Sequence, residues 1–301
     1  MDSSLIALAL MDGVSSAALL FLVALGLTLI FGVMRILNVA HGSLYAWGGY
    51  FAATLGLGIG QFGLPHWLAL PALFFSALVI GGLLGTVLEF TLLRRILDKD
   101  PILQLLITFA AFMVLEDVQR LIWGVQPVFV SDVVTQLGTL SVAGVTYTRY
   151  QLLVLPGVAV AAFLGLRWFL GRTAMGRQVM AVTHHREIAT AMGVNTNRVT
   201  WLTIAMGGAL GALGGALASP TTSFTPGIGA DMMVLSFAVV ATAGLGQIGG
   251  AALAALMIGM ARSFAIYLMP EVEVLMPYLI MVGVLLIRPE GLFSTAAARR
   301  I

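Results

Sequence analysis

Three groups of polar residues could carry chemistry in a chain that otherwise offers little of it. Only 9% of the 301 residues are charged and 60% are hydrophobic, so each ionisable cluster stands out. The first lies in THHREIATAMGVN (183–195), where two histidines, an arginine and a glutamate stand among apolar residues at helical spacing. The second surrounds Glu116, and the third lies in NVAHGSLYAWGGY (38–50). A function of this chain is expected to use at least one of these groups.

These residue types form no recognisable catalytic or metal-binding motif. An ATP-binding P-loop needs a Gly-Lys-Ser/Thr sequence, and the only lysine, Lys99, stands in LDKDP. The chain has no Gly-x-Ser-x-Gly elbow and no cysteine. Its four histidines (41, 66, 184 and 185) lack the spacing of metal ligands. The sequence therefore predicts no catalytic residue, no metal site and no cofactor bound by this chain.

The acidic group near position 116 has the spacing of an ion pair. Glu116 and Arg120 are four residues apart, which places them on one helix face, and Asp117 is adjacent. Counting from Pro101 puts the group near the outer end of its span. It is either an interfacial ion pair, or part of an outer gate or of a docking site for an extracytoplasmic partner. Glu89 is expected to pair with Arg94 or Arg95 at the inner end of an earlier span.

The segment 38–50 concentrates polar residues and glycines where a span begins. One interpretation is a polar helix start with close packing. The other is a pathway-lining or gating segment, in which unwound backbone meets a water-filled cavity. The candidate residues are Asn38, His41, Gly42, Ser43 and Tyr45.

The segment 183–195 predicts one short helix, in which Ala181, His185, Ile188 and Met192 share a stripe and Gly193 forms the C-terminal end. An amphipathic helix on the lipid surface is one interpretation. However, small residues suit a groove in another protein better, which favours a coupling helix. Its candidate contact residues are His184, His185, Arg186, Glu187, Ala189, Thr190 and Gly193.

The elements that must position these residues are membrane-spanning helices. A mean hydropathy of +1.03 and 9% charged residues leave too little polar surface for a water-soluble domain. The runs 5–33, 66–90, 200–219 and 249–269 can each cross a hydrocarbon core. The first run lacks a basic n-region and a cleavage site, so it predicts a retained helix. We expect an all-α polytopic protein in a lipid bilayer, with no nucleic-acid partner.

The positions of the arginines predict the topology. Basic clusters at 94–99, 167–198 and 288–300 are expected to face the cytoplasm. Even numbers of spans between them give about nine spans, with eight to ten allowed, N-out and C-in. Residues 1–301 then form one domain with a cytoplasmic coupling loop at 171–199 and an outer loop at 124–149, which alternates like a small hairpin. RILNVAHGS (35–43) and GLGQIGG (244–250) are each either a loop or a break within an element.

Glycines recur on helix faces inside the expected bundle. Gly207, Gly211 and Gly215 repeat at every fourth position, as do Gly81 and Gly85. Such faces allow backbones to approach closely. They are interpreted as ordinary packing surfaces, with a moving seam as the alternative.

GRTAMGRQVMAVTHHREIATAMGVNTNRV (171–199) resembles the cytoplasmic loop of ABC-importer permeases for branched-chain amino acids, in which a degenerate Glu-Ala-Ala-x-x-x-Gly motif docks into the ATPase subunit. Ala189 and Gly193 match it loosely, whereas Thr190 departs from Ala and His184–His185–Arg186 replaces small or acidic residues. The segment 26–50, GLGQIGG and RPEGLF (288–293) extend the similarity over nearly the whole chain.

The resemblance implies a permease subunit of the bacterial cytoplasmic membrane. Its implied partners are a second homologous permease, two ATPase subunits that hold ATP and Mg, and an extracytoplasmic solute-binding protein. The implied substrate is a branched-chain amino acid or a related small neutral or zwitterionic solute. There are two alternatives: an ATP-independent secondary carrier or channel, and a membrane scaffold without a pathway. Inverted repeats with broken helices would support the carrier.

Overall fold

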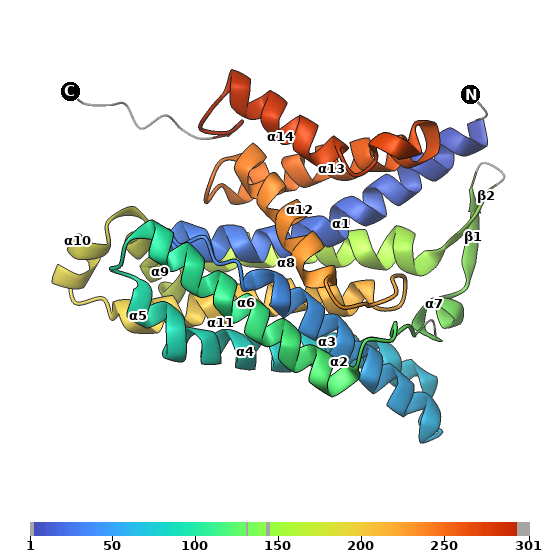
Figure 1. The fold of residues 1–301 in the computed structure, drawn as a ribbon, viewed down its shortest axis with the longest axis horizontal. Coiled ribbons are helices and arrows are strands. Elements are labelled where there is room, and N and C mark those ends of the chain that lie inside the picture. Colours follow the sequence, from blue (N-terminus) through green and yellow to red (C-terminus); the bar gives the residue numbers. More distant parts are fainter. Residues whose placement is uncertain (1–2, 131, 143–144, 294–301) are drawn as a thin grey trace.

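The structure, a computed structural model, describes residues 3–130, 132–142 and 145–293. It is a bundle of helices that run mostly along its long axis (Figure 1). The short helix α10 (Arg186–Ala191) lies at one end, and the hairpin of β1 (Thr139–Val142) and β2 (Val145–Thr148) lies at the other. We refer to these as the α10 end and the hairpin end.

The first half of the bundle contains α1 (Ser3–Met34), α2 (His41–Gln61), η1 (His66–Leu68), α3 (Ala69–Ser76), η2 (Ala77–Gly81), α4 (Gly82–Leu88), η3 (Glu89–Leu93), α5 (Arg94–Ile96) and α6 (Pro101–Trp123). The second half contains α7 (Asp132–Leu137), η4 (Tyr150–Val154), α8 (Leu155–Arg172), α9 (Ala174–His184), α11 (Thr196–Ala218), α12 (Ile228–Ala243), α13 (Ile248–Leu268), η5 (Pro270–Val272) and α14 (Met276–Ile287).

Six helices of the described chain are long and apolar enough to cross a membrane. Two of them combine adjoining segments, because Ala69–Ile96 includes π-helical turns and Tyr150–Arg172 begins with one. The six are Ser4–Met34, Ala69–Ile96, Pro101–Trp123, Tyr150–Arg172, Thr196–Ala218 and Ile248–Leu268. The expected all-α polytopic membrane architecture is therefore confirmed.

Local sequence signals account for several helix starts. Asp100 precedes Pro101, and its carboxylate accepts a 2.8 Å hydrogen bond from the Ile102 amide at the start of α6. The Thr173 hydroxyl accepts from the Gly176 amide at 2.9 Å, and the Asn195 side chain from the Arg198 amide at 3.1 Å. These side chains satisfy amides that have no partner within the helix.

The core lies where α1, α2 and α11 cross, and small residues allow that crossing. A Cβ on Gly215 would lie 1.8 Å from the Tyr45 carbonyl oxygen, and one on Gly48 would lie 2.2 Å from that of Ala212. Gly207 and Gly81 make similarly close backbone contacts with α1 and α11. The glycine faces predicted from the sequence are thus packing surfaces.

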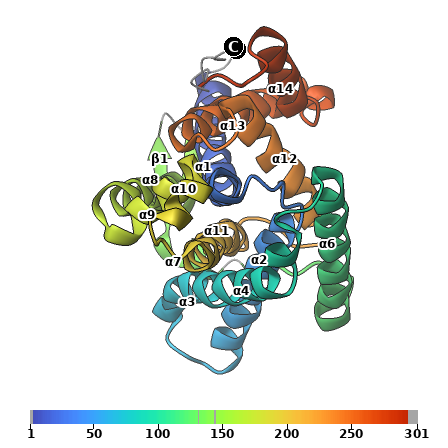
Figure 2. The ribbon, with the colours of Figure 1, turned by 90° about the vertical axis from the view of Figure 1, so that its left-hand side faces the viewer.

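The outer layer is formed by helices with large apolar exposed faces. Within an apolar stretch of 18 residues, only 17% of the residues are buried in α6 and in Tyr150–Arg172, compared with 83% in α1. Seen from the α10 end, α6 and α14 lie on either side of α12, while α8 and α9 lie on the opposite side of the bundle (Figure 2). These faces are the ones available to lipid and to other subunits.

Three connections decide between alternatives that the sequence left open. Residues 35–40 are not helical and α2 starts at His41, so this segment is a break in which Arg35 is exposed and residues 36–40 are buried or half-buried. Residues 244–247 of GLGQIGG form a tight turn between α12 and α13, in which Gly244 (φ 102°) and Gly246 (φ 83°) take backbone conformations that favour glycine, and residues 248–250 begin α13. The predicted hairpin in the loop 124–149 is present, with Thr139 opposite Thr148.

The prediction of one continuous helix over 183–195 is wrong. α9 ends at His184, and His185 takes an extended conformation (φ −147°, ψ 89°) before α10 begins at Arg186. The stripe of Ala181, His185, Ile188 and Met192 does not form, because the helical register is interrupted at His185.

Candidate functional site

After the exposed Arg35, the segment that precedes α2 is buried or half-buried although its backbone is irregular. α1 ends at Met34, Arg35 has a positive φ of 55°, and the chain turns back into the bundle. Asn38 is 1% exposed, and the His41 ring, fully buried, lies 3.1 Å from the Val23 carbonyl through Nε2. Non-helical backbone at such depth is tolerated where protein or a water-filled cavity surrounds it.

Several buried polar atoms of this segment have no protein partner. They are both side-chain atoms of Asn38, Nδ1 of His41 and Oγ of Ser43. Buried polar groups usually find a partner in protein or in ordered water. These three residues of the predicted pathway set therefore mark a polar region inside an apolar bundle. The other two pack tightly: Gly42 touches Gly229, and the Tyr45 ring stacks on Phe224 with centroids 5.6 Å apart.

A second helix starts inside the bundle at the same place. After α11 ends near the hairpin end, residues 219–227 turn back, and α12 begins beyond Gly227 (φ 96°). A Cβ on Gly42 would lie 2.2 Å from the Gly229 carbonyl oxygen, so the starts of α2 and α12 are in contact. From this point α2 runs toward the hairpin end and α12 toward the α10 end (Figure 1). Interrupted helices of this kind line substrate sites in transporters.

A narrow gap, with no room for a water molecule, lies beside this contact. Its lining joins two groups that the sequence analysis treated separately, because Ser43 comes from the first turn of α2 and Glu116 from α6. The complete lining is Ser43, Ala46, Phe112, Glu116, Gln119, Gly227 and Gly229. The unpartnered Ser43 hydroxyl and Glu116 thus belong to residues that line the same gap.

The predicted ion pair around Glu116 forms on α6. Arg120 Nη2 lies 2.5 Å from Glu116 Oε1, and Arg120 Nη1 lies 3.4 Å from Asp117 Oδ1. Glu116 is mostly covered, whereas Arg120 and Asp117 are exposed. Glu116, paired with Arg120, is also one of the residues that line the gap.

Sequence reasoning missed Asp231. This residue lies in the first turn of α12, one turn beyond Gly227, and is exposed. Its backbone N–H donates to the Gly227 carbonyl at 3.3 Å, but its carboxylate makes no hydrogen bond or ion pair with any other described residue. Placing an unpaired carboxylate against lipid costs about 2.5–3.5 kcal/mol or more. The signal was available, since Asp231 is the only acid in the apolar run 228–243.

Sequence reasoning also missed Asp12 in α1. Its hydrogen-bond partners account for a carboxylate at this position, and its role is structural. The hydroxyls of Tyr147 and Tyr267 donate to its two carboxylate oxygens. Burial, followed by the hydrogen bond and charge of Asp12, raises the pKa of Tyr147 on β2, so this hydroxyl remains a donor at neutral pH. Asp12 therefore anchors the hairpin to α1 and α13.

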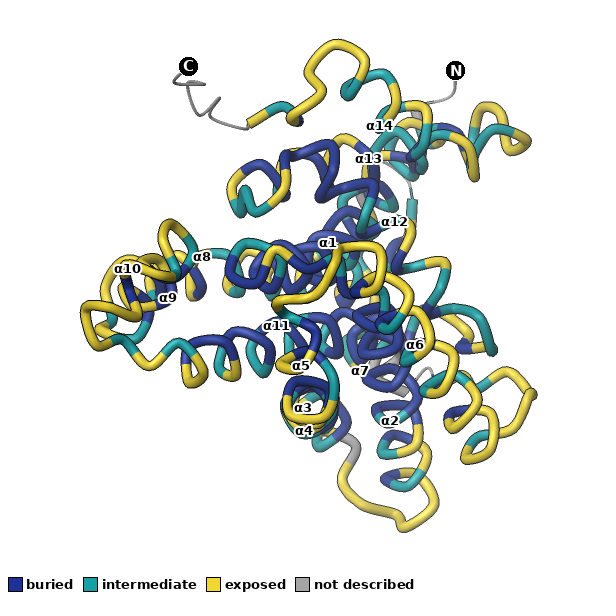
Figure 3. The backbone as a smooth tube through the Cα atoms, turned by 60° about the vertical axis from the view of Figure 1, so that its left-hand side comes forward, coloured by how far each residue is buried: buried dark blue, intermediate teal, exposed yellow. Residues whose placement is uncertain are grey.

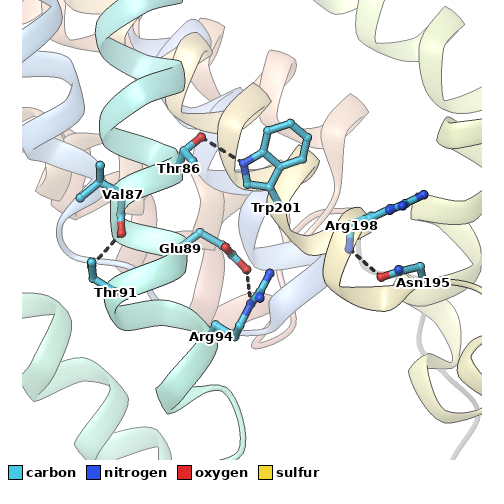
Figure 4. Close-up of polar contacts among 8 residues, drawn as sticks. All are labelled: Thr86, Val87, Glu89, Thr91, Arg94, Asn195, Arg198 and Trp201. Carbon is cyan, nitrogen blue, oxygen red and sulfur yellow. Dashed lines mark hydrogen bonds and ion pairs between the residues drawn. The ribbon is translucent and has the colours of Figure 1, made fainter.

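The predicted Glu89 pair lies toward the α10 end, where α4 and α11 pack together (Figure 4). Arg94 Nε donates to Glu89 Oε1 at 3.0 Å; the Glu89 side chain is 0% exposed and that of Arg94 is 38% exposed. Glu89 Oε2 has no partner. Nearby, the Trp201 indole donates to the Thr86 hydroxyl at 3.1 Å and ties α11 to α4.

The predicted coupling residues surround the break between α9 and α10, a mainly exposed end of the molecule (Figure 3). α10 ends in a Schellman motif, in which Val194 N–H donates to the Ala189 carbonyl and Gly193 N–H to that of Thr190. Gly193 has a φ of 85°. Most of the set is exposed, but Ala189 packs into the chain's own core and His184 lines a groove between α1, α8 and α9.

Within the described residues, no three His, Asp or Glu side chains gather as metal ligands would. The geometry instead combines a polar break at the centre of the bundle with an exposed helix pair at one end. This arrangement fits a membrane transport subunit.

Comparison with known proteins identifies the family. A profile described as "Branched-chain amino acid transport system / permease component" matches residues 9–285. The chain therefore belongs to this family of transport-system permeases, which is not a family of catalytic subunits. It is a multi-pass membrane protein, as its six long apolar helices also indicate.

Curated relatives span nearly the whole chain. It is 25% identical to the high-affinity branched-chain amino acid transport permease LivH of Escherichia coli, with 96% of both chains covered. It is 24% identical to BraD of Pseudomonas aeruginosa, with 97% of both covered. It is 26% identical to a probable LivH of Methanocaldococcus jannaschii, with 91% of this chain and 88% of that protein covered.

A solved structure shares the fold. PsaBC from Streptococcus pneumoniae, in complex with a Fab, superposes with a TM-score of 0.50 at 16% identity, covering 95% of this chain and 92% of the other. At this identity the similarity describes the arrangement of helices and not the transported solute.

Proposed function

We propose that this chain is the translocation subunit of an ATP-driven importer for branched-chain amino acids. The observation that carries the proposal is the family match over residues 9–285, together with relatives of the same length that transport such amino acids. The absence of a P-loop agrees with ATP and Mg binding on separate subunits. The proposed partners are a second permease, two ATPases and a solute-binding protein.

The proposed topology has nine spans: the six long helices together with α2, α12 and α14. The α10 end carries the arginine-rich segment 167–198 and faces the cytoplasm, and the hairpin end faces outward. Arg299 and Arg300 of the third basic cluster lie outside the described residues. We place the protein in the bacterial cytoplasmic membrane.

In this arrangement α9, α10 and the Schellman turn form the contact with an ATPase. α9 and α10 lie at one end of the bundle (Figure 1), many of their residues are exposed, and a short turn connects α10 to α11. Since α11 packs against both α1 and α2, a displacement of α10 would be transmitted to the polar break at Asn38–Ser43. Coupling of this kind needs a rigid connection between the two sites.

Purification and uptake test the proposal. The tagged permease should co-purify with a second permease and two ATPase subunits encoded with it. In proteoliposomes, uptake of radiolabelled leucine should require ATP and the solute-binding protein. Leucine uptake by the permease alone without ATP would establish the alternative, a secondary carrier or channel.

A further inference from the structure

The depth of Asp231 in the bundle can be measured in two ways. The His41 ring packs against Gly211, about 10 Å along α11 from its end at Ala218, and Gly229 meets Gly42 beside that ring. Asp231 lies about half a turn beyond Gly229. From the other side, α12 continues for about 18 Å from Asp231 to its end at Ala243. Both measures place the carboxylate within the hydrocarbon region of a bilayer about 30 Å thick.

The surroundings of Asp231 do not explain its charge. It is exposed, and no described residue pairs with its carboxylate. The next exposed residue on this face of α12, Val234, is apolar. The helix itself lies between α6 and α14 (Figure 2). Intramembrane carboxylates normally face a protein partner or a water-filled pathway rather than lipid.

Unpartnered polar atoms lie at the same depth in the bundle. One turn from Asp231, the first residues of α12 border the narrow gap beside Gly42 and Gly229, which has no room for a water molecule. The Ser43 hydroxyl on its wall is 2% exposed and has no partner. Polar groups are therefore present at this depth in two places: inside the bundle, at Ser43, and on the exposed face of the first turn of α12, at Asp231.

We propose that Asp231 binds the ammonium group of an amino acid on its way through the permease. This inference rests on the proposed function, because every free α-amino acid carries that group at neutral pH. A carboxylate in a low-dielectric pathway attracts an ammonium group strongly. This attraction does not depend on the side chain of the transported amino acid. Asp231 would thus admit α-amino acids, while neutral solutes without an ammonium group would gain nothing from it.

The test uses the complete transporter with its binding protein in proteoliposomes. Asp231→Asn preserves the shape of the side chain and removes its charge, and Asp231→Glu preserves the charge. Asp98→Asn, at an exposed site in the turn after α5, is the matched control. We expect Asp231→Asn to lower the amount of leucine imported per ATP hydrolysed at least tenfold, Asp231→Glu to retain more, and Asp98→Asn to match the wild type.

Subunit composition and binding-protein-stimulated ATP hydrolysis should stay within about twofold of the wild type in all three variants. Unchanged leucine import by Asp231→Asn would overturn the inference. Loss of the second permease from Asp231→Asn would also overturn it, because it would assign Asp231 to a cation of that subunit. Failure of the wild type to import any amino acid would instead contradict the proposed function.

Discussion

At the scale of single residues, Gly193 shows how backbone conformation can control a contact surface. Its φ of 85° lies in the left-handed region, and no atom of this chain lies within 4 Å of a Cβ placed there. Packing within the chain therefore does not require glycine at this position. Glycine is required by the turn, where a side chain costs about 1–2 kcal/mol, and any close packing must come from an ATPase.

Gly193→Leu should consequently weaken ATPase docking while the permease still inserts. We expect ATPase retention during purification, and ATP-driven uptake, to fall by roughly tenfold, since 1.4 kcal/mol corresponds to that factor. Gly193→Asn is the matched control, because Asn tolerates the left-handed conformation, and it should lose less. Full retention and uptake in Gly193→Leu would remove this turn from the coupling surface.

The ion pair of Glu89 and Arg94 should respond asymmetrically to mutation. Arg94→Gln leaves a fully buried carboxylate unpaired, which typically costs about 3–5 kcal/mol. Glu89→Gln removes the buried charge and leaves an arginine that already reaches solvent, so we expect a loss of about 1 kcal/mol or less. Thermal unfolding in detergent would measure both, and the double variant should resemble Glu89→Gln. Equal losses of stability in the two single variants would show that the cost of leaving the buried Glu89 carboxylate unpaired does not determine the effect of Arg94→Gln.

At the scale of elements, the crossing of α2 and α11 depends on glycine because the main-chain atoms of the two helices are in direct contact there. The Cβ of Gly215→Ala would overlap the Tyr45 carbonyl, and neither main chain can move without displacing the buried break before α2. We expect a loss of stability of about 1–3 kcal/mol, as for other overpacked cores. Gly58→Ala on α2 meets no atom within 4 Å and should be neutral or slightly stabilising. Similar melting temperatures for both variants would contradict this account.

At the scale of the whole molecule, the orientation in the membrane can be tested with introduced cysteines, because the chain has none. Thr146 lies in the hairpin, whereas Asp98 and Asn197 lie at or near the α10 end, and all three are exposed. We expect a membrane-impermeant thiol reagent to label Cys at position 146 in intact cells, and at 98 and 197 only after lysis. Labelling of position 197 from outside would reverse the proposed topology.

The sequence by itself determined the features that arise from local chemistry. Low charge and long apolar runs required spanning helices, spacing of four predicted the pair of Glu116 and Arg120, and Gly193 marked a helix end. The glycine repeats on α11 predicted close helix contacts. Each of these follows from residues near one another in the chain, so no distant contact is needed to infer them.

Only the tertiary structure decided which distant residues meet. The depth at which α2 and α12 start is set by the contact of Gly42 with Gly229, which are far apart in the chain. That contact also brings Ser43 beside Glu116 and leaves Asp231 exposed at the middle of the bundle. Likewise, the break at His185 is not visible as a glycine or a proline. Such features depend on packing between segments, and helical periodicity describes only one segment at a time.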